Sequence, residues 1–339
     1  KNGEYVYMAQ LVKLQDYISR YQIDLARYPT QFVRLKKNQW NRVKYQWQTG
    51  EEIGQWQHIE EEPEEELVEK ERFSFLKKLL PGRQKQIEKE EDIETLNVST
   101  ELDEDMIAEE ESTLHFEPNI VYHPQTLEEL KRMFMDQFFH FQLKWASSTT
   151  REKSYVDPKF MRDTLLRSLL QNLPDSYLIF YRPILRLKKA PVELEILILT
   201  PVDCYIVRAL EEEDHAVYIG DGERFWTKKV GKYDKKTLSP MIDLQRTETI
   251  VNKLFELEGI EMPIRKVILS RNGYIDYPGS VYGLQFVDKR KYAEWMQQMK
   301  RSISPMKHMQ IRAAQVILKS AETTSFHRDI WNVEESKGE

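Results

Sequence analysis

The chain has 339 residues, of which 40% are hydrophobic and 11% aromatic, and its formal net charge is −6. This length favours two domains, and the composition suffices for a hydrophobic core, which argues against a wholly disordered chain. The charge is unevenly distributed. Residues 51–112 contain 22 acidic and 7 basic side chains, which leaves the rest of the chain with a net charge of about +9. Basic parts around an acidic segment suit contact with nucleic acid or anionic lipid, but the same charges are more simply interpreted as an ordinary solvated surface.

A single cysteine, Cys204, excludes an intrachain disulfide and argues against a cysteine-based zinc site. It fits a reducing cytosol, so we expect a cytoplasmic protein. No apolar run approaches the ~18 residues of a membrane span, and no signal-peptide pattern is present, so we expect no membrane contact.

Near the N-terminus, apolar residues recur every three or four positions from Leu11 to Tyr28. This spacing predicts an amphipathic helix that ends at Pro29. Thr30 is a suitable cap for a second helix, so residues 8–48 are predicted to form a helical hairpin. Its basic side, interleaved with tryptophans, suits either stacking of single-stranded nucleic acid or an ordinary packed hairpin.

Residues 49–116 are rich in acids and lack apolar periodicity, which predicts a flexible linker. Within this linker, residues 73–80 are apolar enough for a short docking helix. Segments 8–48 and 73–80 are therefore the candidate contacts for a protein partner. The oligomeric state is not predicted.

Residues 117–322 alternate helix and strand patterns, which predicts an α/β domain with a mixed central sheet flanked by helices. A loosely held tail is expected over 323–339. Helices are expected to start at Thr126, Asp157, Asp243, Asp288 and Ser304. Strands are expected at 177–181, 184–187, 192–199, 204–210, 216–220, 224–227, 266–270 and 281–287, and 228–240 reads as a basic loop.

The strand pair 192–199 and 204–210 is the centre of this domain. Side chains alternate along a strand, so Glu193 and Glu195 share one face of the first strand. Paired carboxylates on adjacent strands are an arrangement by which metal-dependent nucleases hold Mg²⁺. The alternative is that both glutamates lie on a solvated rim.

Residues 183–279 resemble the nuclease-related domain (NERD) family of the restriction-endonuclease-like superfamily. The resemblance rests on the strand pair 192–210, on Trp226, and on the helix start at 239–245. It implies a restriction-endonuclease-like mixed sheet. In that family, an aspartate on the first strand and a Glu-x-Lys on the second form the metal site.

The resemblance aligns these positions with Leu197, Arg208 and Leu210, so all three groups are replaced, and Gln245 is the site-like residue that persists. This implies a catalytically inactive domain without a cofactor. The alternative is a nuclease with a shifted site, in which Glu195, Gln245 and either Glu211 or Glu213 act with Mg²⁺ or Mn²⁺, and Glu193 and Glu195 hold the metal.

We therefore expect a binding module for DNA, RNA or a protein partner. Candidate contacts fall into two basic sets, one in the expected loop and one near the C-terminus. They are Lys228, Lys229, Lys232, Lys235 and Lys236 in the first set and Lys300, Arg301, Lys307, Arg312 and Lys319 in the second.

Overall fold

The computed structural model describes residues 6–50, 116, 118, 124–187, 190–211, 213–301 and 304–327. The chain divides into two compact units, 1–42 with 118–339 and 43–117. In the second unit, the described residues are the C-terminal end of helix α1 (Tyr28–Thr49), the following Gly50, and Phe116. The predicted acidic linker and the island at 73–80 lie almost wholly outside the described residues.

Six strands form the central sheet of the first unit, in the order β1-β3-β6-β7-β11-β13. β1 runs parallel to β3, the neighbours β3, β6 and β7 alternate in direction, and β11 and β13 run parallel to β7. The sheet is therefore mixed, as predicted. The strands are β1 (Gln10–Leu14), β3 (Leu178–Tyr181), β6 (Ile196–Leu199), β7 (Cys204–Ala209), β11 (Ile264–Leu269) and β13 (Leu284–Val287).

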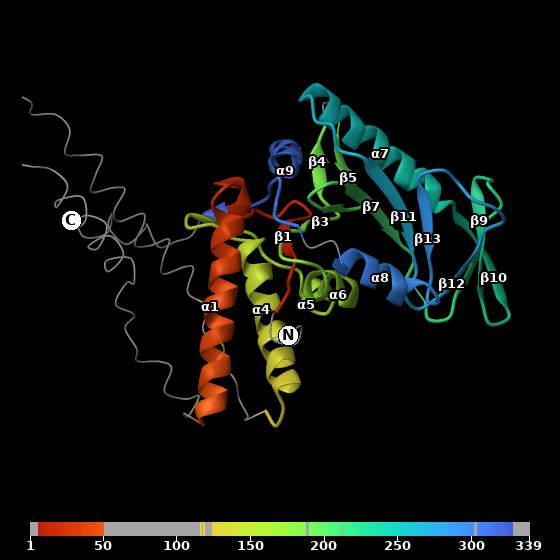
Figure 1. Cartoon of the computed structure of the whole chain (residues 1–339). Coiled ribbons are helices and arrows are strands. Elements are labelled where there is room, and N and C mark those ends of the chain that lie inside the picture. Colours follow the sequence, from red (N-terminus) through yellow and green to blue (C-terminus); the bar gives the residue numbers. More distant parts are fainter. Residues whose placement is uncertain are drawn as a thin grey trace, which may run out of the picture. The chain divides into compact units, whose positions relative to one another are not determined.

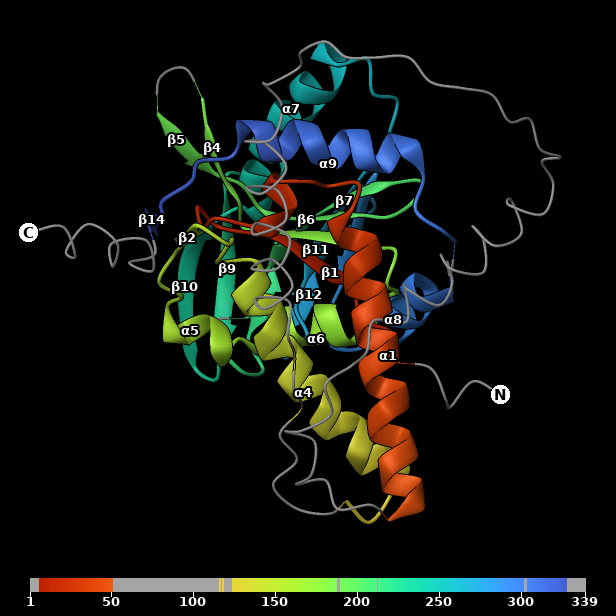
Figure 2. The ribbon, with the colours of Figure 1, turned by 90° about the vertical axis from the view of Figure 1, so that its left-hand side faces the viewer.

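Helices cover both faces of this sheet, which confirms the predicted layering. α7 (Pro240–Leu257) and α9 (His308–Ser320) lie over one face, and α6 (Thr164–Asn172) and α8 (Tyr292–Arg301) lie over the other (Figure 1, Figure 2). Their inward faces are apolar, as α6 illustrates with Leu166, Leu169 and Leu170, all fully buried. α4 (Leu127–Trp145) begins at the expected Thr126 cap and packs beside β1 and α6.

A second sheet of four strands has the order β10-β9-β8-β12. Trp226 of β9 is fully buried and packs against the rings of Tyr277 and Phe286. A Cβ at Gly220 would lie 2.3 Å from the Trp226 ring, so only glycine fits there. The strands are β8 (Val217–Ile219), β9 (Phe225–Val230), β10 (Tyr233–Leu238) and β12 (Tyr274–Asp276).

The predicted N-terminal helical hairpin is wrong. Residues Gln10–Leu14 form β1, a short 3-10 helix covers Arg20–Gln22, and one long helix, α1, follows. All five residues of β1 are buried, so the strand shows no alternation of apolar and polar residues that would distinguish it from a helix. Pro29 lies in the first turn of α1, where its missing N–H costs nothing, and so begins a helix instead of ending one.

The outer edge of β1 is closed by Gln142 of α4. The Leu11 amide donates to Gln142 Oε1 at 2.8 Å, and Gln142 Nε2 donates to the Ala9 carbonyl at 2.8 Å. These two bonds satisfy backbone groups that an edge strand would otherwise leave unpaired.

Two smaller expectations also need correction. The helix predicted from Asp157 is two helices, α5 (Pro158–Met161) and α6, because Asp163 accepts bonds from the Leu165 and Leu166 amides and caps a new start. The predicted basic loop at 228–240 is mostly the β9–β10 hairpin.

The start of the expected loose tail is ordered by pairing. Strand β14 (Phe326–His327) pairs with β2 (Glu152–Lys153), and the Thr324 amide donates to the Asp16 carbonyl at 2.8 Å. Residues 328–339 are outside the described part. A further two-stranded sheet joins β4 (Ile184–Arg186) to β5 (Pro191–Glu193). Within the described ranges, no helix is both long enough and apolar enough to cross a membrane.

Candidate functional site

The position that the resemblance assigns to a metal site contains an arginine bound to two carboxylates. Arg208 of β7 points toward α7, and its Nη1 lies 2.9 Å from Glu195 Oε1. Its Nη2 lies 3.5 Å from Asp243 Oδ2, in the first turn of α7. Asp243 also lies 3.6 Å from Arg246. The cluster thus alternates negative and positive charges across the β6–β7 pair and α7.

The Glu195 side chain is almost completely excluded from solvent. Its side chain is 8% exposed, while that of Arg208 is 32% exposed. Burial raises the pKa of Glu195, and the nearby Arg208 guanidinium opposes this rise. The Glu195 backbone amide donates to Thr247 Oγ1 on α7 at 3.3 Å. The carboxylate is therefore fixed to Arg208 and shielded by α7.

The other residues of the hypothetical shifted site do not join this cluster. Gln245 is exposed, because it lies about 200° around the helix from both Asp243 and Thr247, which face the sheet. Glu193 is exposed at the end of β5, which belongs to a separate two-stranded sheet. The shifted site, which was the alternative to an inactive domain, required Glu195, Gln245 and either Glu211 or Glu213 to converge, with Glu193 as a further metal ligand. The structure does not bring these side chains together, because their elements direct them apart.

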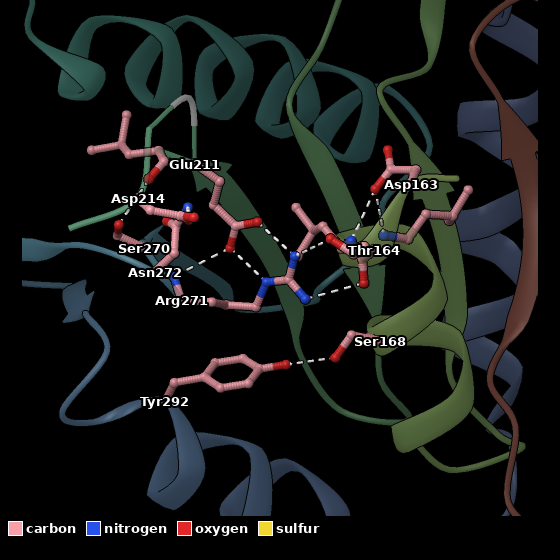
Figure 3. A network of polar contacts seen from close by, with 12 residues as sticks. Asp163, Thr164, Ser168, Glu211, Asp214, Ser270, Arg271, Asn272 and Tyr292 are labelled. Carbon is pink, nitrogen blue, oxygen red and sulfur yellow. Dashed lines mark hydrogen bonds and ion pairs between the residues drawn. The ribbon is translucent and has the colours of Figure 1, made fainter. Parts of the chain in front are cut away.

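Glu211 belongs to a different network, on the side of the sheet that α6 covers (Figure 3). Arg271 binds it with two bonds, from Nε to Oε1 and from Nη2 to Oε2, both 2.6 Å. The same guanidinium donates to the carbonyl and hydroxyl oxygens of Thr164 at 3.0 Å. Arg271 therefore ties the ends of β7 and β11 to the first turn of α6.

Neighbouring polar pairs extend this network. Asn272 Nδ2 donates to Asp214 Oδ1 at 2.8 Å, and Ser168 Oγ lies 2.7 Å from the Tyr292 hydroxyl (Figure 3). Each of these residues makes at least one of these contacts within the protein, although the buried Asn272 Oδ1 has no hydrogen-bond partner, so the main role of the network is to join elements. Arg271 was missed at the sequence level because nothing in its local pattern links it to Glu211, 60 residues earlier.

No group of three or more His, Cys, Asp or Glu side chains in the described ranges is arranged to hold a metal ion. The absence of a cofactor stays a prediction.

The predicted basic contacts divide into buried and exposed residues. Lys228 is buried and its Nζ lies 3.0 Å from Glu213 Oε1, so its assignment as a surface contact is wrong. Side chains alternate along β9, and Lys228 shares the inward face with Trp226. The charged group of Glu213 pairs with this inward lysine.

The exposed part of the β9–β10 hairpin combines lysines with aromatic rings. Lys232 and Lys235 are exposed, Lys236 donates to Thr227 Oγ1 at 3.0 Å, and Lys229 lies 3.8 Å from Asp234. Two aromatic residues accompany them: Tyr233 is 83% exposed and Phe225 is 50% exposed.

The second predicted basic set does not form one continuous row. Lys300 and Arg301 end α8, whereas Lys307 precedes α9 and Lys319 lies in its last turn. Arg312 donates to the Glu258 carbonyl at the end of α7. Lys300 and Arg301 instead share a cavity with cations of α4, which the sequence-level search did not single out.

Comparison with known proteins gives limited information. No model of a known protein family matches the chain, and no solved structure matches it significantly. An RNA 2',3'-cyclic phosphodiesterase from Geobacillus stearothermophilus is 51% identical over 41 residues. This match covers 12% of this chain and 13% of that protein, so the chain spans only a small part of the relative's length. A match this short shows neither a shared family nor a shared activity.

Proposed function

We propose that this protein is a nuclease-like domain of the NERD type that has lost its metal site and binds single-stranded nucleic acid without cleaving it. The observation that carries the proposal is the Arg208–Glu195 ion pair, at the position where the resemblance expects a metal ligand. The mixed sheet with helices on both faces, and the antiparallel β6–β7 pair, are compatible with a restriction-endonuclease-like ancestry.

Arg208 and a divalent metal compete for the same carboxylate. Mg²⁺ binds oxygen at about 2.0–2.1 Å and requires several oxygen ligands in octahedral geometry. A guanidinium 2.9 Å from Glu195 Oε1 already supplies the positive charge, and it would repel a second cation in this poorly solvated place. Leu197, fully buried on the same strand face, supplies no ligand.

The β9–β10 hairpin supplies the proposed binding surface. Aromatic rings next to lysines suit a single strand, because bases stack on the rings and phosphates pair with the ammonium groups. Tyr233 and Lys235 share one face of the exposed strand β10, and Lys236 lies on the opposite face beside Thr227, so both kinds of contact are represented on this strand.

The test is fluorescence anisotropy with labelled 20-nucleotide RNA and DNA strands at several salt concentrations. RNA is the first probe, because the short match is to an enzyme named for RNA. For the triple variant Tyr233→Ala/Lys235→Ala/Lys236→Ala we expect affinity to fall about tenfold or more. We also expect the slope of log affinity against log salt concentration to become shallower by about 1.4. The variant removes two lysines, and each phosphate contact on a single strand contributes about 0.7 to this slope.

A matched control changes exposed residues of the same types elsewhere, in Lys37→Ala/Lys253→Ala/Tyr282→Ala. Equal losses in both triple variants, or no binding by the natural sequence at low salt, would contradict the binding surface. Cleavage of either strand in Mg²⁺ or Mn²⁺ that disappears in Glu195→Gln would contradict the loss of catalysis.

A further inference from the structure

A cavity of about 850 Å³ lies among α4, α6 and α8, and no residue of the β9–β10 hairpin lines it. Its wall contains two cations from α4, Lys131 and Arg132, and two from the end of α8, Lys300 and Arg301. Glu128 is the acidic residue in the lining. The cavity therefore has a positive excess from side chains about 170 positions apart in the sequence.

The positive charges of the cavity act on one another. Burial, followed by the positive charge of Lys131, lowers the pKa of Lys300. Asp136, on the next turn of α4, is paired with Arg167 at 2.6 Å and accepts a bond from Gln171 at 3.0 Å.

Helix dipoles explain only half of this arrangement. Lys300 and Arg301 lie in the last turn of α8, where cations are favourable near the partial negative charge of the helix end. Lys131 and Arg132 lie beyond the first turn of α4, where the effect of the helix dipole is small. The dipole of α4 therefore does not account for these two cations.

Hydrogen bonds fix the Lys300 ammonium group at the wall. Its Nζ donates to Asn172 Oδ1 at 2.9 Å, and Asn172 Nδ2 donates to the Ser168 carbonyl at 2.9 Å. Ser168 is in turn joined to Tyr292 of α8 (Figure 3). The α6–α8 contact thus holds one cation in place before any ligand binds, which reduces the entropy cost of binding.

We propose that this cavity binds the phosphomonoester of a nucleotide, either as a free mononucleotide or at the 5′ end of a nucleic-acid strand. The four cations match the double negative charge and the oxygen acceptors of a phosphomonoester. The volume is within the usual range for small-molecule sites and is far larger than inorganic phosphate requires. Tyr7, 37% exposed in the lining, provides a ring for the base, and the side-chain amide of Gln297 provides a donor and an acceptor for its edge.

The test uses three probes on the full chain: inorganic phosphate and AMP by calorimetry, and a pair of 12-nucleotide RNAs, labelled at the 3′ end, with a 5′-phosphate or a 5′-hydroxyl. We expect AMP to bind more tightly than phosphate, or the 5′-phosphate to strengthen RNA binding by about tenfold. Tighter binding of AMP alone identifies a free nucleotide as the ligand, and a gain from the 5′-phosphate identifies a strand end.

Two charge reversals at exposed cavity residues, Arg132→Glu/Arg301→Glu, should abolish the phosphate-dependent gain. A control with the same change in charge, Arg34→Glu/Lys253→Glu, uses exposed residues outside the cavity lining and should retain it. Circular dichroism checks that both variants fold.

The hairpin variant separates this proposal from the proposed function. The variant Tyr233→Ala/Lys235→Ala/Lys236→Ala should bind both RNAs more weakly and preserve the difference in affinity between the 5′-phosphate and 5′-hydroxyl RNAs. The cavity proposal is overturned if AMP binds no better than phosphate and the two RNAs bind equally, or if the control variant loses the gain as the cavity variant does. If the hairpin variant binds both RNAs more weakly but still prefers the 5′-phosphate, the result supports the proposed function and the cavity proposal independently.

Discussion

Two arginine–glutamate pairs lie near the C-terminal end of β7, one on each side of the sheet. Toward α7, Arg208 binds the nearly buried Glu195 with one short contact, at 2.9 Å. Toward α6, Arg271 binds Glu211 with two, both at 2.6 Å, and also holds Thr164. The chemistry is the same, but the first pair neutralises a carboxylate that the fold has buried, and the second joins three elements. The first pair therefore matters through the burial of its carboxylate, and the second through the number of elements that it connects.

The largest expected effect is at Arg208. Arg208→Leu leaves the Glu195 carboxylate buried without its closest cation, and we expect a loss of about 3 kcal/mol in the free energy of unfolding at pH 7. Urea unfolding measures it. The double variant Glu195→Gln/Arg208→Leu also removes the negative charge of Glu195 and should recover part of this loss. A double variant no more stable than Arg208→Leu would mean that the arginine acts through packing instead of charge.

Arg271→Leu should cost less, about 2 kcal/mol, although it removes more hydrogen bonds. Glu211 has a 16% exposed side chain, twice the exposed fraction of Glu195, and regains water more readily. Hydrogen exchange should increase at the first turn of α6, because Thr164 loses its link to β11. Unchanged exchange there would indicate that Arg271 does not anchor α6.

A smaller effect tests whether the Arg208 position retains the geometry of a metal site. In Arg208→Glu, three carboxylates would lie between β6, β7 and α7, and Mg²⁺ at about ten times its dissociation constant should stabilise the variant by about 1.4 kcal/mol. Thermal unfolding with and without Mg²⁺ measures this gain. Arg271→Glu is the matched control on the opposite side. An equal response of both variants would refute a site-specific effect.

The smallest effect is a pH dependence carried by Glu195. Its pKa is raised in the folded state by burial, so the folded protein holds this proton more tightly than the unfolded chain does. The contribution of Glu195 to the free energy of unfolding is therefore fully present at pH values below its pKa in the unfolded chain. It is lost as the pH rises through its pKa in the folded protein. Urea unfolding between pH 4 and 8 should show that the free energy of unfolding declines more steeply with rising pH for the natural sequence than for Glu195→Gln. Parallel curves would exclude this contribution.

Local sequence patterns predicted the layered α/β architecture because its main elements carry local signals. The Thr126 cap, the inward row of α7 and the antiparallel pair β6–β7 are all visible in short windows. β1 was misread because a strand buried on both faces has no period of two, and its leucines happened to match helical spacing. β10 was misread as a loop because lysines and an aspartate are uncommon in strands.

The candidate sites were less predictable because they depend on contacts between distant residues. That Arg208 and Leu197 stand where the resemblance places metal ligands stays a prediction, and the sequence contained no sign that Arg208 would reach Asp243 on α7. Lys131 and Lys300 are brought to one cavity only by the packing of α4 against the α6–α8 side of the sheet. Such proximity is a property of tertiary structure.

The position of β1 has a consequence for the order in which the protein is made. Among the described residues, β1 pairs with β3, whose residues Leu178–Tyr181 are synthesised more than 160 positions later. Its other edge is closed by Gln142, which is also made later. At about 5–20 residues per second, the apolar segment Gln10–Leu14 would stay without its partners for roughly ten to thirty seconds on the ribosome. Residues 51–112, made in the meantime, are strongly acidic. β1 is thus made early and completes its pairing late.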